Sequence, residues 1–399
     1  MIEIGLILLA AISFIVLLSF LVFFHELGHY SVARFFGVAV DRFSIGFGKP
    51  IFRWTSKAGV DWRISNIPLG GYVKFAGDAG AASNPDHDQL EAIKAAHEND
   101  PNAPPLEDIF HFKPVWQRML IVLAGPVANF ILAIFIFAGL GMAFGKETFV
   151  WVVGEVIEGM PAQQAGIQPG DKILKLDGKV VEDTRDVTAY ISLRSGTPIL
   201  MTIEKNGEMR EVEVTPQRVE DRDAIGGTTT IGRVGIRSDP ENSERAFEKV
   251  GVLDAIPYGF SETGFHLGAT LGYIKRIFTG KENGKQLGSV VKIATVTGKL
   301  ATDSVQVDGT AKDRLRRYLA TMFSLMAMIS IALGVANLMP LPVLDGGHLL
   351  YYSYEAVSGR PLSQQKQEFG YKIGFAVLLT LFVVLTINDI GYLRSIDFS

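Results

Sequence analysis

Residues 4–36 read IGLILLAAISFIVLLSFLVFFHELGHYSVARFF, and this stretch decides the fold. Its first 21 residues carry no charge, and about 20 apolar residues are enough to cross the hydrocarbon core of a bilayer. No Lys or Arg precedes the apolar run, and the run is long for the core of a secretion signal. We therefore expect residues 1–36 to form a retained transmembrane helix that ends in the sequence His25-Glu26-Leu27-Gly28-His29.

Two histidines four residues apart indicate a metal site on this helix. Positions i and i+4 lie on one face, so His25 and His29 can reach the same ion. Glu26 lies beside them, where it can hold or deprotonate a water molecule at the metal. Polar groups in a spanning helix are costly unless they are satisfied. We expect His25 and His29 to be metal ligands and Glu26 to be catalytic; the alternative is two satisfied core histidines.

A candidate third ligand lies in residues 337–348, which read NLMPLPVLDGGH. Pro340 and Pro342 break a helix here, and irregular backbone at membrane depth is tolerated only where it is buried in protein or lines a cavity. A carboxylate in such a break needs a partner, and a metal ion bound by Asp345 supplies one. The alternative is an Asp that caps a helix. We expect His348 behind the ligands, because a fourth protein ligand would leave no open position.

Composition narrows the choice of metal and of partners. The chain has no Cys, which excludes thiolate zinc sites, iron–sulfur clusters and disulfides. Two His and one carboxylate also describe a non-haem iron site, but an oxygenase does not need Glu26 beside the first His, whereas hydrolysis does. We therefore expect one Zn²⁺ per chain. The balance of 38 Lys and Arg against 42 Asp and Glu gives no support for nucleic-acid binding.

Further apolar runs predict three more transmembrane helices, at 119–144, at 318–350 (with the Leu344-Asp345-Gly346-Gly347-His348 sequence) and at 369–391. The connection between the first two spans is rich in Lys and Arg, so we expect it in the cytosol. Both termini and the segment between the second and third spans are then outside, with the active site toward the cytosol. The basic residues just before the third span, from Lys312 to Arg317, oppose this orientation.

The remaining segments predict soluble parts. Residues 37–77 alternate like β-hairpins, and residues 78–118 read as an acidic flexible loop. Residues 150–216 predict a small α/β domain whose Asn206-Gly207 pair is typical of a hairpin turn. Residues 217–317 read as a linker with one amphipathic helix, which lies on the membrane surface or on that domain.

The α/β segment resembles a PDZ domain of the bacterial, circularly permuted type. The resemblance is carried by the stretch from Gly159 to Gly166, by Pro169-Gly170-Asp171 and by Asp177-Gly178. PDZ domains bind extended peptides at a sheet edge. The predicted fold class is thus a polytopic α-helical membrane protein with four transmembrane helices, a membrane-associated β-hairpin region and an inserted α/β PDZ-like domain.

The whole pattern resembles the site-2 protease family of intramembrane zinc metalloproteases, and within it the bacterial regulator-of-sigma-E protease branch. The stretch Gly125-Pro126-Val127-Ala128-Asn129 and the hairpin around Gly70-Gly71-Tyr72-Val73-Lys74 match the family too. The resemblance implies that His25, His29 and Asp345 are ligands and Glu26 is the base. It implies substrate-binding roles for seven residues: Asn337, Pro340, Pro342, Gly70, Gly71, Tyr72 and Val73. We expect Asn129 behind the metal ligands. The best-known members carry two tandem PDZ domains, whereas this sequence predicts one.

Two functions follow as hypotheses. The first is a protease of the bacterial inner membrane that cleaves within the transmembrane segments of single-span proteins, such as anti-sigma-factor-type substrates or signal-peptide remnants. The second is a non-catalytic adaptor that displays a PDZ module and holds a structural metal. A structural site has no use for Glu26, which favours the protease. The PDZ-like domain then either binds an extracytoplasmic peptide or admits only substrates whose ectodomain has already been trimmed.

Overall fold

The computed structural model describes residues 2–78, 87–99, 105–149, 151–181, 184–222, 228–239, 245–282, 284 and 287–394. The chain divides into two compact units. The first comprises Met1–Phe135 with Thr297–Val383, and the second comprises Ile136–Val296 with Val384–Ser399. The candidate metal site lies within the first unit, and the α/β segment lies within the second.

Among the described residues, four helices are long and apolar enough to cross a membrane, as the sequence predicts. They are α1 (Ile2–Phe35), α3 (Val115–Phe144), α8 (Ala311–Asn337) and α10 (Gln364–Leu393). The expected third span, 318–350, is divided: α8 ends at Asn337, and a separate helix, α9 (Asp345–Ser358), follows the proline-containing turn. This division makes Asp345 the first residue of a helix.

Helices α1 and α3 approach closely because small residues face each other. A Cβ atom added at Gly28 would lie 2.3 Å from the carbonyl oxygen of Ala124 and 2.8 Å from the Cβ of Ala128. Small residues at helix contacts let backbones come together in membranes. The contact brings the histidine turn of α1 against α3.

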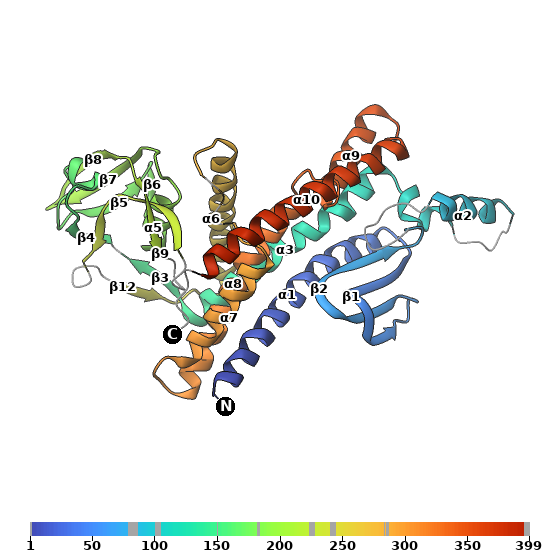
Figure 1. Ribbon diagram of the computed structural model, residues 1–399, viewed down its shortest axis with the longest axis horizontal. Coiled ribbons are helices and arrows are strands. Elements are labelled where there is room, and N and C mark those ends of the chain that lie inside the picture. Colours follow the sequence, from blue (N-terminus) through green and yellow to red (C-terminus); the bar gives the residue numbers. More distant parts are fainter. Residues whose placement is uncertain are drawn as a thin grey trace. The chain divides into compact units, whose positions relative to one another are not determined.

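The hairpin region forms one folded sheet from two long, bent strands, β1 (Val40–Thr55) and β2 (Asp61–Phe75). Gly46 and Gly48 adopt positive φ angles of 82° and 87°, which redirect β1 midway. Residues 42–45 consequently pair with 71–74 on one side and with 61–64 on the other. Within the described part of the chain, segment 71–75 is therefore an outer strand, and Figure 1 shows the hairpin beside the C-terminal half of α1.

Apolar side chains from the hairpin, α1, α3 and α9 form the core of this unit. Phe43 and Phe110 are fully buried in it, and Phe75 stacks on Phe110 with ring centroids 4.7 Å apart. The segment before α3 contains α2 (His87–Asn99) and two short 3₁₀ turns, η1 (Leu106–Asp108) and η2 (Phe110–Phe112). Part of the expected acidic loop, 79–86 and 100–104, lies outside the described residues.

The α/β segment contains both strands and helices, as its sequence predicts. They are β4 (Trp151–Val156), α4 (Pro161–Gln164), β5 (Lys172–Leu176), β6 (Lys179–Val180), α5 (Thr184–Ser192), β7 (Ile199–Lys205) and β8 (Glu208–Val214). Asn206 and Gly207 both have positive φ, 53° and 87°, as a two-residue hairpin turn requires. The sheet order is β11-β4-β5-β7-β8, with β6 on β5.

Residues 217–317 hold more structure than a linker with one helix. Strand β11 (Ile236–Ser238) pairs with β4, β9 (Gln217–Arg222) pairs with β10 (Thr228–Arg233), and β12 (Arg245–Glu248) pairs with β3 (Lys146–Phe149). Two helices follow, α6 (Val252–Phe278) and α7 (Val290–Gln306). These strands are short, and β11 and β12 pair with strands far upstream. Local alternation of apolar and polar residues therefore does not predict them.

Candidate metal centre

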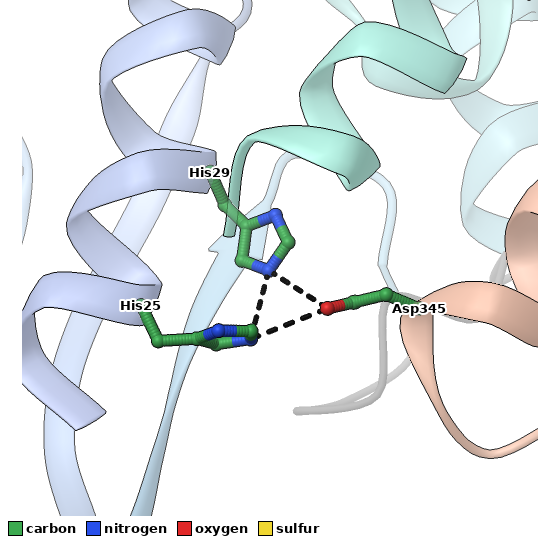
Figure 2. Close-up of side chains that lie close together, drawn as sticks. All are labelled: His25, His29 and Asp345. Atoms are coloured by element: carbon green, nitrogen blue, oxygen red, sulfur yellow. Dashed lines mark hydrogen bonds and ion pairs between the residues drawn. The ribbon is translucent and has the colours of Figure 1, made fainter. Parts of the chain in front are cut away.

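Two neighbouring histidines on α1 and a carboxylate from the distant α9 meet in the first unit. The Nε2 atoms of His25 and His29 lie 3.2 Å and 3.5 Å from Oδ2 of Asp345, and 3.3 Å from each other. Figure 2 shows the two imidazoles reaching from α1 toward the carboxylate at the start of α9. The structure thus brings together the three residues for which the sequence predicts metal binding.

Local backbone geometry places Asp345 at this point. The turn between α8 and α9 folds back onto the start of α9. A Cβ atom at Gly346 would lie 2.3 Å from the carbonyl oxygen of Met339, and one at Gly347 would lie 2.3 Å from that of Leu341. Only glycines permit such an approach, which explains why two glycines follow the carboxylate.

Hydrogen bonds behind the imidazoles set their orientation. Nδ1 of His29 lies 2.9 Å from the carbonyl oxygen of Ile121, so it carries the proton and donates. The amide of Asn129 lies 3.0 Å from Nδ1 of His25, and its buried Oδ1 has no hydrogen-bond partner among the described residues. An amide turned with Oδ1 toward His25 accepts the Nδ1 proton. In that arrangement both Nε2 atoms present lone pairs to the centre.

The donor set fits a divalent cation. Two imidazole lone pairs and a carboxylate oxygen converge, and Oδ2 of Asp345 accepts no hydrogen bond in the described part of the chain. Three acceptors with no proton between them repel one another in a buried site, and a cation removes that repulsion. Nitrogen and oxygen ligands of this kind suit Zn²⁺, which commonly takes three protein ligands in catalytic sites.

The same three residues border a cavity of about 200 Å³ that also contains Glu26. Of the other residues that the sequence singles out, Gly71, Tyr72, Val73, Asn337 and His348 line it as well. The amide nitrogen of Asn337 lies 3.4 Å from Nε2 of His25. The outer strand 71–75, the catalytic candidate and the metal ligands therefore share one space.

Three expected substrate-binding residues do not line this cavity. Gly70 has a positive φ of 104° and lies against the ring of Phe47, so it bends the strand. Pro342 packs against α10 at Gly374, and Pro340 lies in the same turn. Conversely, Tyr352 lines the cavity and was not expected there. Its spacing of four residues from His348 on one helix was the available signal.

Two imidazoles and a carboxylate gathered between apolar helices, with a glutamate in the same cavity, define a multi-pass membrane metalloprotein. Comparisons with known proteins specify its class. The model of peptidase family M50 matches residues 13–381. Metalloprotease MmpA of Caulobacter vibrioides is 40% identical over 384 residues, which are 96% of each chain.

Two further relatives bear the name "putative zinc metalloprotease". The one from Rhizobium meliloti is 38% identical over 381 residues, and the one from Agrobacterium fabrum is 40% identical over 382 residues; each alignment covers 96% of both chains. The chain belongs to peptidase family M50, the site-2 protease family, and is a zinc metalloprotease.

The close contact at Gly125 yields a test of the site geometry. A Cβ atom there would lie 2.2 Å from Nε2 of His29 and 2.9 Å from Cε1 of His25, so Gly125→Ala must displace the imidazoles. We expect bound zinc to fall and proteolysis to drop about 100-fold, as small misplacements of catalytic groups do. Zinc content and cleavage rate of the purified variant measure this.

The matched control is Gly139→Ala on the same helix, where an added Cβ meets nothing within 4 Å. Alanine is the better helix former at both positions, by about 1 kcal/mol, so propensity does not explain a loss. A Gly125→Ala variant with the zinc and activity of Gly139→Ala would refute the packing described here.

Proposed function

We propose that this protein hydrolyses peptide bonds within the transmembrane segments of single-span membrane proteins. One observation carries the proposal: a cavity bordered by His25, His29 and Asp345 also contains Glu26 and the outer strand 71–75. The apolar run before His25 supports a site at membrane depth. We propose anti-sigma-factor-type proteins and signal-peptide remnants as the substrate classes.

In this proposal His25, His29 and Asp345 hold the zinc ion, and Glu26 is the general base. Bound zinc supplies Lewis acidity that polarises a peptide carbonyl and acidifies water. Glu26 takes a proton from the attacking water and delivers it to the amine that leaves. The Glu26 side chain lies against the strand, since a Cβ atom added at Gly71 would lie 3.3 Å from its Cγ.

The substrate is proposed to bind in extended form. A transmembrane helix hides its carbonyl groups in internal hydrogen bonds, so it must unwind before hydrolysis. An unwound segment can add to the edge of strand 71–75 by main-chain hydrogen bonds, next to Gly71, Tyr72 and Val73. The Asn337 amide borders the cavity and is proposed to hold a substrate carbonyl. Pro340 and Pro342 act indirectly, by shaping the turn that carries Val343 and Leu344 into the cavity wall.

We further propose that the protein lies in the bacterial inner membrane with both termini outside and the site toward the cytosol. The basic residues between the first two spans support this orientation. The segment 150–216, extended by β11, is proposed to be a PDZ-like domain. Because a bulky ectodomain would collide with a domain tethered outside, we propose that it admits substrates already trimmed by another protease. Peptide binding at its sheet edge is the competing role.

Replacement of the proposed base separates catalysis from metal binding. Glu26→Gln keeps the size of the side chain and removes its basicity. We expect zinc content near that of the wild type and no measurable cleavage of a single-span substrate by the purified protein in detergent or nanodiscs. Substantial residual cleavage would contradict the mechanism.

Removal of the proposed carboxylate ligand has a different signature. Asp345→Ala leaves two imidazoles, which hold zinc weakly, so we expect loss of most bound zinc together with activity. Metal analysis after dialysis against a weak chelator measures the change. Full zinc occupancy in this variant would shift the ligand assignment to His348.

The absence of Cys makes orientation testable with single introduced thiols. Lys57→Cys, in the turn of the hairpin, should be shielded from an impermeant thiol reagent in intact cells. Lys179→Cys, in the proposed PDZ-like domain, should be labelled, and both should react after the membrane is opened. The reverse pattern would overturn the proposed orientation.

A further inference from the structure

Three long side chains from one short segment bind the ends or flanks of three elements that build the site: strand 71–75, α1 and α9. The segment runs from His111 in η2 to Arg118 in the first turn of α3, and we call it the anchor segment. None of its side chains is a metal ligand. Its contacts are polar and largely shielded from solvent. Loss of one partner therefore costs free energy, and the intact contacts hold the side chains in one geometry.

His111 holds the outer strand. Its Nε2 lies 2.7 Å from Oδ1 of Asp78, a carboxylate with no solvent exposure. The other carboxylate oxygen accepts the backbone N–H of Phe75 at 2.9 Å. The carboxylate therefore links the end of strand 71–75 to the anchor segment.

Lys113 fixes the anchor segment to the helix that carries the imidazoles. Its ammonium donates to the carbonyl oxygen of Phe36 at 2.6 Å, just past the end of α1. The last carbonyls of a helix lack partners within the helix, and a lysine there satisfies one of them. The segment is thereby tied to the C-terminal end of the helix that bears His25 and His29.

Arg118 holds the helix that begins with Asp345. Its guanidinium lies 2.6 Å from Oε1 of Glu355 in α9 and 4.8 Å from the ring centre of Tyr352. Its Nε donates to the backbone oxygen of Lys113 at 3.0 Å. Glu355 is ten residues after Asp345, about 15 Å along the helix, so Arg118 acts through α9 and not by contact with the site.

We propose that the anchor segment sets the relative positions of strand 71–75, α1 and α9. His111 and Arg118 are positioning residues, and each affects a different part of the site. His111 determines the register of the substrate through the strand. Arg118 determines how firmly Asp345 closes the zinc site. The role of His111 in substrate register rests on the proposed function. The role of Arg118 in zinc retention does not depend on it.

The roles of the two positioning residues can be distinguished by two measurements, the position of the cleaved bond and the rate of zinc dissociation. General destabilisation would change both in the same way in the two variants. In His111→Gln, zinc should dissociate at the wild-type rate, while cleavage should spread to bonds about two residues from the main site, since strand faces alternate with that period. In Arg118→Gln, the cleaved bond should be unchanged, while zinc should leave faster because α9 holds Asp345 less firmly. The increase should be at most about 10-fold, the lower end of what loss of a direct partner of a metal ligand costs.

Matched controls are His97→Gln and Arg360→Gln, because both residues are solvent-exposed. Mass spectrometry of the products gives the cleaved bond, and transfer of zinc to a chromogenic chelator gives its dissociation rate. Asp78→Asn keeps an acceptor for the Phe75 N–H and should retain the wild-type cleavage position better than Asp78→Ala. The double change Arg118→Gln with Glu355→Gln removes the partly buried carboxylate that the single change leaves unpaired, and it should slow zinc release again.

Equal loss of zinc, rate and melting temperature in His111→Gln and Arg118→Gln would make the anchor segment a general stabiliser and overturn the proposal. So would wild-type product positions and zinc release in both. If wild-type protein cleaves no single-span substrate at all, the proposed function fails. Faster zinc release in Arg118→Gln alone would still support the anchor.

Discussion

The site is built around three hydrogen-bond acceptor atoms that converge without a proton between them. Holding these atoms together is the main constraint on the surrounding fold. The Nε2 atoms of His25 and His29 and Oδ2 of Asp345 lie 3.2–3.5 Å apart among buried groups. Their mutual repulsion is strong where water is scarce, and a cation is the simple remedy. The surrounding fold holds the three atoms together. Glycines allow α3 to pack closely against the imidazoles, and the folded-back turn before α9 places the carboxylate beside them.

The cavity joins this centre to an outer strand and a glutamate, and that conjunction links metal chemistry to proteolysis. Peptide hydrolysis requires an exposed backbone, which a transmembrane helix does not offer. In the proposed function, an unwound segment adds to the strand edge at the metal centre by main-chain hydrogen bonds. In our proposal, the anchor segment keeps strand 71–75 and α9 at a fixed separation. It contacts the end of the strand through Asp78 and α9 through Glu355.

The sequence predicts the centre well because its signals are local. His25 and His29 share a helix face, and the prolines and glycines around Asp345 announce a break. The Asn206-Gly207 turn is equally local: the predicted hairpin is present between β7 and β8, and both turn residues have positive φ. The sequence gives no sign of strand β11, whose partner β4 lies far upstream, or of the pairs His111–Asp78 and Arg118–Glu355, which form only in the folded chain. Pro340 and Pro342 are in the predicted turn, but the periodicity of a broken helix does not reveal which side chains face the cavity.

X-ray absorption at the zinc edge of the purified wild-type protein tests the central claim most directly, because it reports the ligands of the metal themselves. The account predicts scattering from two imidazoles, with nitrogen and oxygen neighbours at about 2.0–2.1 Å. It predicts that Asp345→Ala changes the oxygen contribution or leaves no zinc to measure. A third imidazole contribution in the wild type, or a wild-type spectrum that Asp345→Ala leaves unchanged, would contradict the assignment of His25, His29 and Asp345.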